Sequence, residues 1–128
     1  MRSTTEWRQS FPKMSEIVIT DEKKLLSALG LCARAGKITV GIPLICEAMK
    51  RGGDKMPRIV FEASDTSPNT HKRICDRCAY YGVRLVRISS DAMTLAAAVG
   101  KLSPIGAVAV TDTQMSCLTE KYIKFGSI

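Results

Sequence analysis

The sequence predicts a single-domain α/β protein, a three-layer α/β/α sandwich with a mixed and mostly buried sheet. Its 128 residues suit one domain, since domains typically hold about 100–200 residues. Short apolar runs rich in β-branched residues alternate with amphipathic stretches, and this alternation is typical of a sheet covered by helices on both faces. The runs are almost free of polar residues, so the strands that they form must be buried on both sides.

Each expected element has a boundary signal. Asp21 is an N-cap residue and Gly36 ends the first helix, while Gly41 and Pro43 begin the second helix and Gly52 ends it. The expected helices cover residues 22–35, 42–51, 69–81, 91–99 and 112–124. The expected strands cover residues 57–63, 83–88 and 105–110, and the extended stretch 37–40 is expected to add an edge strand of either sense.

The first residues show no periodicity that would form a helix or strand. We therefore expect residues 1–19 to be a flexible N-terminal tail and residues 20–128 to be the folded domain. Met14 follows Pro12-Lys13 and is a hypothetical alternative start of the chain.

Charge and composition indicate a polyanionic partner. Nineteen Lys and Arg against twelve Asp and Glu give a net charge of +7, which favours nucleic acid. The aromatic residues, one Trp, three Tyr and three Phe, are too scattered for the base-stacking platforms of many RNA-binding sheets and barrels. Contacts with the backbone and shape of a nucleic acid are therefore expected.

The same composition argues against secretion and membrane insertion. The chain has five cysteines, an odd number, and it opens without the pattern of a secretory signal. Its apolar stretches are far shorter than the roughly 20 residues of a membrane helix. We expect a cytoplasmic protein with reduced cysteines.

No enzyme is predicted, because no group of residues forms a recognisable catalytic or cofactor site. His71, the single histidine, lies among basic residues and is interpreted as part of a solvated helix face. Cys75 and Cys78 form a CxxC in the middle of an expected helix, where packing is favoured over redox sensitivity, and a zinc site would need two more ligands. Phosphate-binding glycine motifs are absent from the sequence. Neither a cofactor nor a metal is expected.

The start of the second expected helix stands out because it lacks a capping side chain. Ile42 occupies the approximate N-cap position, so backbone N–H groups of the first turn are open to an outside acceptor. Gly41 permits a close approach and Lys37 adds a cation nearby. The alternative is an ordinary exposed helix end that binds water.

Four segments together resemble a known family: LLSALGLCARAGKITVG (25–41), EAMKRG (47–52), IVFEASDTSPNTHKRICDRCAYYGV (59–83) and SSDAMTLAAAVGK (89–101). They are similar to the small RNA-binding ribosomal proteins of the L7Ae/L30e type, in particular to the bacterial YlxQ-like members. The resemblance implies a three-layer α/β/α fold and binding to kinked RNA, commonly the kink-turn, without catalysis or cofactor.

The resemblance also places the RNA-binding residues. In the family, the glycine before the second helix and the first turn after it enter the RNA groove, and the loop after strand 83–88 covers a flipped base. The residues expected to bind RNA are Lys37, Gly41, Ile42, Pro43, Leu44, Arg87, Ile88, Ser89 and Ser90. Where the family typically has Asn, Glu and Lys, this chain has Pro43, Leu44 and Glu47, which implies weaker base readout and repulsion of phosphate.

The expected partner is RNA, structured or ribosomal, with components of the ribosome or of transcription and translation as further candidates, and the expected state is a monomer. An alternative hypothesis is a protein–protein interaction module that has lost kink-turn specificity and docks through the apolar segment Ile42-Pro43-Leu44.

Overall fold

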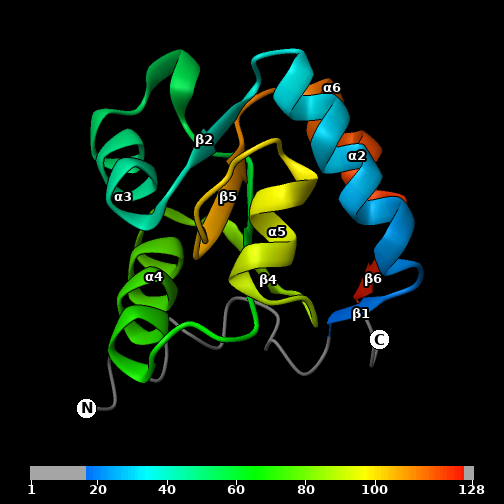
Figure 1. Cartoon of the computed structure of the whole chain (residues 1–128). Coiled ribbons are helices and arrows are strands. Elements are labelled where there is room, and N and C mark those ends of the chain that lie inside the picture. The colour runs from blue at the N-terminus through cyan, green and yellow to red at the C-terminus, as the bar shows by residue number, and fades with distance from the viewer. Residues whose placement is uncertain (1–16, 126–128) are drawn as a thin grey trace.

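The computed structural model describes residues 17–125, which form a four-stranded sheet, a two-stranded sheet and the helices around them (Figure 1). The helices are α2 (Glu22–Arg34), α3 (Ile42–Arg51), α4 (Pro68–Tyr81), α5 (Ala92–Ala98) and α6 (Thr113–Glu120), with a 3-10 turn η2 (Gly53–Lys55). The strands are β1 (Ile17–Ile19), β2 (Ile38–Val40), β3 (Ile59–Glu62), β4 (Arg84–Arg87), β5 (Ala107–Val110) and β6 (Ile123–Phe125).

The larger sheet is mixed and has the order β2-β5-β3-β4. Strands β3 and β4 are parallel, whereas β5 is antiparallel to both of its neighbours, β3 and β2. The last residues of β2, β3 and β4 therefore lie at the same end of the sheet as the first residue of β5. We call this the Gly41 end, because Gly41 directly follows β2 there.

Helices cover both faces of the sheet (Figure 1). Helices α2, α5 and α6 lie on one face, against a core that includes Phe61 and Val108. Helices α3 and α4 lie on the other face, against a second core that includes Val60 and Ala109. Consecutive strand residues thus supply opposite cores, as the pleat of a strand requires. The predicted three-layer fold with a mixed, buried sheet is confirmed.

Local signals set several elements as expected. Helix α3 covers the predicted residues 42–51, and α2 and α4 differ from the prediction by one residue each. The helix expected over 112–124 is wrong in its last part, because α6 ends at Glu120 and β6 follows. The reason is a tertiary contact, because β6 pairs antiparallel with β1, with Ile19 opposite Ile123. The 3-10 turn η2 is also absent from the elements that the sequence predicts.

Strand β1 lies inside the segment expected to be a tail. Residues 17–19 are extended and paired, so the folded part of the chain begins earlier than residue 20. The rest of the expected tail, with the alternative start at Met14, lies outside the described residues. Among the helices that the structure describes, none is long and apolar enough to span a bilayer.

Candidate functional site

Backbone hydrogen bonds join four loops into one surface at the Gly41 end of the sheet. The N–H groups of Gly41, Ala63, Ile88 and Ser64 donate to the carbonyls of Ala107, Gly106, Glu62 and Ser90, at 2.9 or 3.0 Å. The two segments expected to bind RNA, 41–44 and 88–90, thus lie at the same end of the sheet. They are three strand spacings apart, about 14 Å, with the loops at 63–66 and 106 between them.

The start of α3 has the open geometry that the sequence predicts. Gly41 is the N-cap with a φ of 95°, in the region that favours glycine, and no side chain caps the helix. Pro43 and Leu44 are exposed, with Leu44 at 60%. Ile42 is only 6% exposed and belongs to the core beneath α3, so its side chain does not face outward as expected for a direct RNA contact.

The loop at 88–90 is held by the packing of Ile88 in the core and by hydrogen bonds to Glu22 on α2. Ile88 is 2% exposed and packs in the core on the α2 face. Glu22 accepts a hydrogen bond from the Ser89 N–H at 3.1 Å and another from the Ser90 hydroxyl. Burial acts to raise the pKa of Glu22, but the hydrogen bonds from Ser90 and Ser89 outweigh it and lower that pKa below 4.5.

The loop after β3 fills the space between the two segments. Arg87 Nη2 donates to the carbonyl of Ser64 at 2.9 Å and to Thr66 Oγ1 at 3.5 Å. A Cβ on Gly106 would lie 3.1 Å from Ile42 Cδ1 and 3.3 Å from Thr66 Cγ2. Arg87, expected as an RNA contact, is exposed but also ties this loop to β4.

Lys37 stands apart from the other expected residues. It precedes β2, and its carbonyl accepts a hydrogen bond from Thr111 at the opposite end of the sheet from Gly41. The length of β2, about 10 Å, separates the two backbones. The structure therefore does not place the Lys37 backbone at the Gly41 end.

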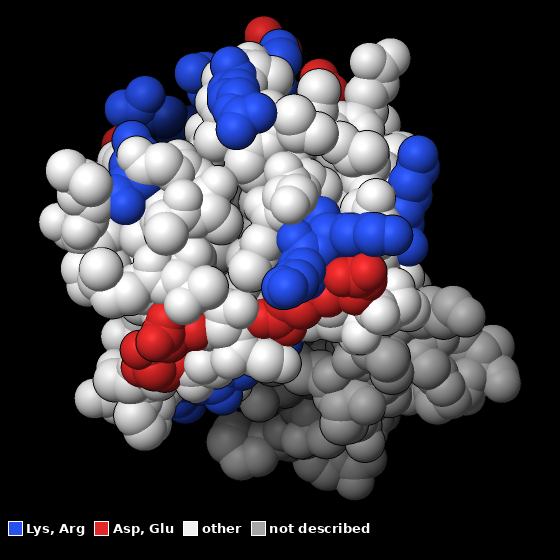
Figure 2. All heavy atoms as spheres, turned by 45° about the vertical axis from the view of Figure 1, so that its right-hand side comes forward, with Lys and Arg blue, Asp and Glu red and all other residues white. Residues whose placement is uncertain are grey.

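Positive charge is dispersed over the face of the molecule that Figure 2 shows. Figure 2 shows Lys and Arg on separate parts of one face, with uncharged surface between them and carboxylates beside some of them. Glu47, on the second turn of α3, pairs with Arg51 at 3.1 Å, and Arg84 pairs with Glu120 at 2.9 Å. The charge favours a polyanion in general and does not by itself locate its site.

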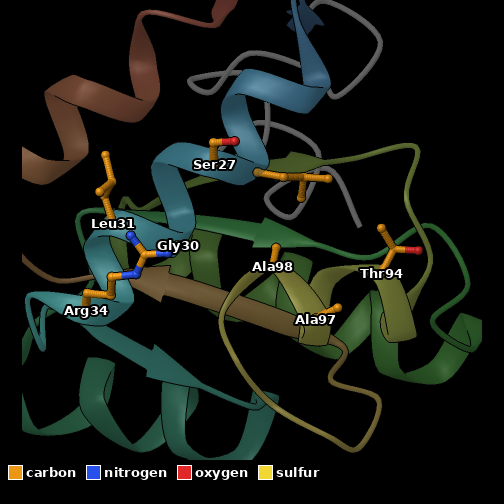
Figure 3. A pocket seen from close by; sticks show the side chains of 8 residues that line it. Ser27, Gly30, Leu31, Arg34, Thr94, Ala97 and Ala98 are labelled. Carbon is orange, nitrogen blue, oxygen red and sulfur yellow. The ribbon is translucent and has the colours of Figure 1, made fainter.

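A groove lies between α2 and α5, and its lining includes none of the residues expected to bind RNA (Figure 3). It holds about 620 Å³ and is lined mostly by small and apolar side chains: Leu26, Ser27, Gly30, Leu31, Arg34, Thr94, Ala97 and Ala98. Gly30 allows the two helices to approach, because a Cβ there would lie 2.8 Å from the carbonyl oxygen of Ala98.

The interpretation of His71 as part of a solvated face is wrong. Its side chain is 28% exposed, and Nδ1 lies 2.8 and 2.9 Å from the two oxygens of Glu62, which is fully buried. Cys75 Sγ lies 3.5 Å from Nε2. The sequence holds a partial signal, since His71 and Cys75 are four residues apart on one helix, but it gives no sign of Glu62.

The two cysteines of the CxxC have different surroundings. Cys78 is 2% exposed in the core beneath α3 and α4, as packing predicts, and burial raises its pKa. Cys75 is half-buried. Among residues 17–125, no group of three or more His, Cys, Asp or Glu side chains is placed to hold a metal ion.

The fold and the site define a small single-domain α/β/α protein whose candidate binding surface is built from loops at one end of the sheet. A model of the Ribosomal protein L7Ae/L30e/S12e/Gadd45 family matches residues 23–120, and the chain belongs to this family. The resemblance inferred from the sequence is confirmed.

Two curated relatives carry the same name, RNA-binding protein YlxQ. The chain is 36% identical to that of Bacillus subtilis (strain 168) over 84 residues, which cover 66% of this chain and 79% of the relative. It is 33% identical to that of Enterococcus faecium over 72 residues, covering 56% and 67%.

Solved structures with the same fold include a protein of unknown function from Bacillus halodurans C. It has a TM-score of 0.65 and 27% identity, and the match covers 76% of this chain and 97% of that one. A Giardia lamblia 15.5kD RNA binding protein has a TM-score of 0.63 at 19% identity, covering 79% and 82%, and supports the fold alone.

Proposed function

We propose that this protein binds structured, kink-turn-like RNA at the Gly41 end of the sheet and catalyses no reaction. The observation that carries the proposal is the juxtaposition at that end of the uncapped start of α3 and the loop at 88–90. The names of the YlxQ relatives support RNA as the partner. The two segments together are wide enough to face one groove of a distorted duplex.

Backbone groups would make much of the contact. The first turn of α3 offers the N–H groups of Ile42 and Leu44, since Pro43 has none, and they carry the partial positive charge of a helix N-terminus. Ser89 presents an exposed side chain on a loop that Glu22 holds in place. Such a surface recognises shape and phosphate more than base identity.

A pair of matched variants tests the location. Pro43→Glu and Gln114→Glu each add one negative charge at an exposed second position of a helix, where a carboxylate is well tolerated. Residue 43 lies at the Gly41 end and residue 114 follows the other end of β5. Binding to a kink-turn RNA and to an unkinked duplex of equal length would be titrated at two salt concentrations.

We expect tighter binding to the kink-turn RNA, and we expect Pro43→Glu to weaken it about fivefold, equivalent to roughly 1 kcal/mol of phosphate repulsion. Gln114→Glu should change it less than about twofold. Equal affinity for both RNAs would reduce the function to nonspecific polyanion binding. Equal weakening by both variants would move the RNA away from this surface.

A second candidate function is protein binding through the same surface, favoured by exposed apolar side chains. Leu44, at the start of α3, is 60% exposed. Leu44 also lines a groove of about 450 Å³ with Val99 and Lys101. If Pro43→Glu leaves RNA binding unchanged, this surface is better assigned to a ribosomal or transcription component.

We also propose that the protein works as a monomer in the cytoplasm. Within residues 17–125 the five cysteines form no disulfide with one another, and reduced thiols suit a reducing compartment.

A further inference from the structure

Glu62, His71 and Cys75 form a contact cluster where α4 packs beside the end of β3. The proposed RNA surface does not use these side chains. Glu62 is 0% exposed, and its two oxygens lie 2.8 and 2.9 Å from His71 Nδ1. Cys75 Sγ lies 3.5 Å from His71 Nε2 and 3.8 Å from Nδ1, close to both ring nitrogens. The imidazole therefore contacts both the carboxylate and the thiol.

The contact with Glu62 fixes which ring nitrogen can act as a base. An ionised carboxylate can only accept, so the proton between Glu62 and His71 belongs to Nδ1. In the neutral ring, Nε2 then carries the lone pair, and it is the ring nitrogen nearer to Cys75 Sγ. Thr66 Oγ1 donates to Glu62 Oε2 at 2.5 Å and holds the carboxylate from another side.

This arrangement has the parts of an activated nucleophile. The thiolate is the reactive form of cysteine, a base within reach of the thiol promotes it, and a third group that orients the base keeps the pair aligned. Small molecules have access, because His71 is 28% exposed and Cys75 is half-buried. Cys78, one turn away, is 2% exposed.

We propose that Cys75 is a nucleophilic thiol, activated by His71 and positioned through Glu62, that forms mixed disulfides with low-molecular-weight disulfides. The Cys75 proton passes to His71 Nε2, and the thiolate attacks one sulfur of the reagent. A bond from Cys75 Sγ to that sulfur forms while the reagent's own S–S bond breaks. The departing thiolate takes the proton back from the imidazolium, so one disulfide is exchanged for another with no net oxidation.

The mixed disulfide should persist once formed. Displacement of the small thiol from within the protein would require attack by a neighbouring cysteine, and burial raises the pKa of Cys78, the neighbour on α4. The adduct would then be removed by another external thiol.

Cys117 is the internal control for reactivity. It is exposed on α6, whereas Cys75 is half-buried, so exposure alone predicts that Cys117 reacts first. The fully reduced chain would be treated with glutathione disulfide below one equivalent at neutral pH, quenched at intervals, and mapped by peptide mass spectrometry. Iodoacetamide would be used in parallel as a reagent that reports thiolate without disulfide exchange.

We expect Cys75 to react about tenfold faster than Cys117, and His71→Gln to slow Cys75 about tenfold while leaving Cys117 unchanged. Glutamine keeps an amide donor for Glu62 but removes the base. Faster reaction at Cys117, or an unchanged Cys75 rate in folded His71→Gln, would overturn the proposal. If His71→Gln unfolds, the buried Cys32 and Cys78 will react as well, and the ratio of Cys75 to Cys117 in the unsubstituted protein then decides.

Discussion

Oε1 of Glu22 accepts a hydrogen bond from the backbone N–H of Ser89, 3.1 Å away and 67 positions further along the chain. The other carboxylate oxygen accepts from the Ser90 hydroxyl. One side chain in the first turn of α2 thereby fixes the loop after β4, which forms one side of the proposed RNA surface. The conformation of that loop is therefore held in part by a residue of another element, α2.

Glu22→Gln should destabilise the protein at neutral pH and not in acid. The pKa of Glu22 is lowered in the folded protein from an ordinary 4.5, so its contribution is fully present above pH 4.5 and is lost as the pH falls through the folded value. We expect a loss of about 1 kcal/mol at pH 7 in urea unfolding, given the partial exposure of the pair. The two proteins should converge as the pH falls below the folded pKa of Glu22. Glu47→Gln is the control, with a loss under about 0.5 kcal/mol at pH 7. A loss for Glu22→Gln that is the same in acid as at pH 7 would contradict the assignment.

Gly30→Ala should destabilise the protein although alanine is the better helix former. The added Cβ would lie 2.8 Å from the carbonyl oxygen of Ala98, so α2 and α5 must separate. Overpacking of this kind costs roughly 1–3 kcal/mol, which exceeds the helix-propensity gain of at most about 1 kcal/mol. Thermal unfolding measures the sign. Ser27→Ala, an exposed change in the same groove, should be neutral or slightly stabilising, and a higher Tm for Gly30→Ala would show that the helices are not in close contact.

Thr66→Val should cost about 1–3 kcal/mol of stability. Valine keeps the shape of the side chain but removes the hydroxyl that donates to the buried carboxylate of Glu62 at 2.5 Å, leaving an acceptor without one of its donors. Chemical denaturation would measure the loss. Thr113→Val, at an exposed position of α6, should change stability by less than about 0.5 kcal/mol. Similar small effects for both variants would mean that the Thr66 bond contributes nothing.

Glu47→Lys should strengthen binding to kink-turn RNA about fivefold, if RNA occupies the proposed surface. Glu47 lies one turn beyond the start of α3 and pairs with exposed Arg51, so the change removes a repulsion, adds a cation and releases Arg51 toward phosphate. Asp54→Lys makes the same change of charge on η2, beyond the far end of α3, and is the control. Equal gains in a salt-dependent titration would indicate a general effect of net charge.

Local signals predicted much of the fold. Gly41 and Pro43 mark the start of α3 and Gly52 marks its end, through backbone preferences that act within a few residues. Helix α3 has the expected limits. The end of α6 was missed because nothing near Lys121 marks a break. Strand β6 is set there by pairing with β1, about a hundred positions earlier in the chain.

The candidate site likewise has one part that the sequence predicts and another that depends on tertiary contacts. The two loops at the Gly41 end follow from strand order and from the family pattern. The hydrogen bonds of Glu22 to Ser89, of Arg87 to Ser64 and of His71 to Glu62 join residues with no local relation. His71 shows the consequence most clearly, since basic neighbours in the sequence suggested solvent, whereas its partner is a buried carboxylate on another element.

The pairing of β1 with β6 determines how the molecule would respond to mechanical force. Ile17, at the start of β1, lies opposite Phe125, at the end of β6. Tension applied through the two ends of the folded chain would therefore open this ribbon one hydrogen-bonded pair at a time, as a zipper, and would not shear it along its length. The two strands should part at low force in a single-molecule pulling experiment, before the four-stranded sheet carries the load.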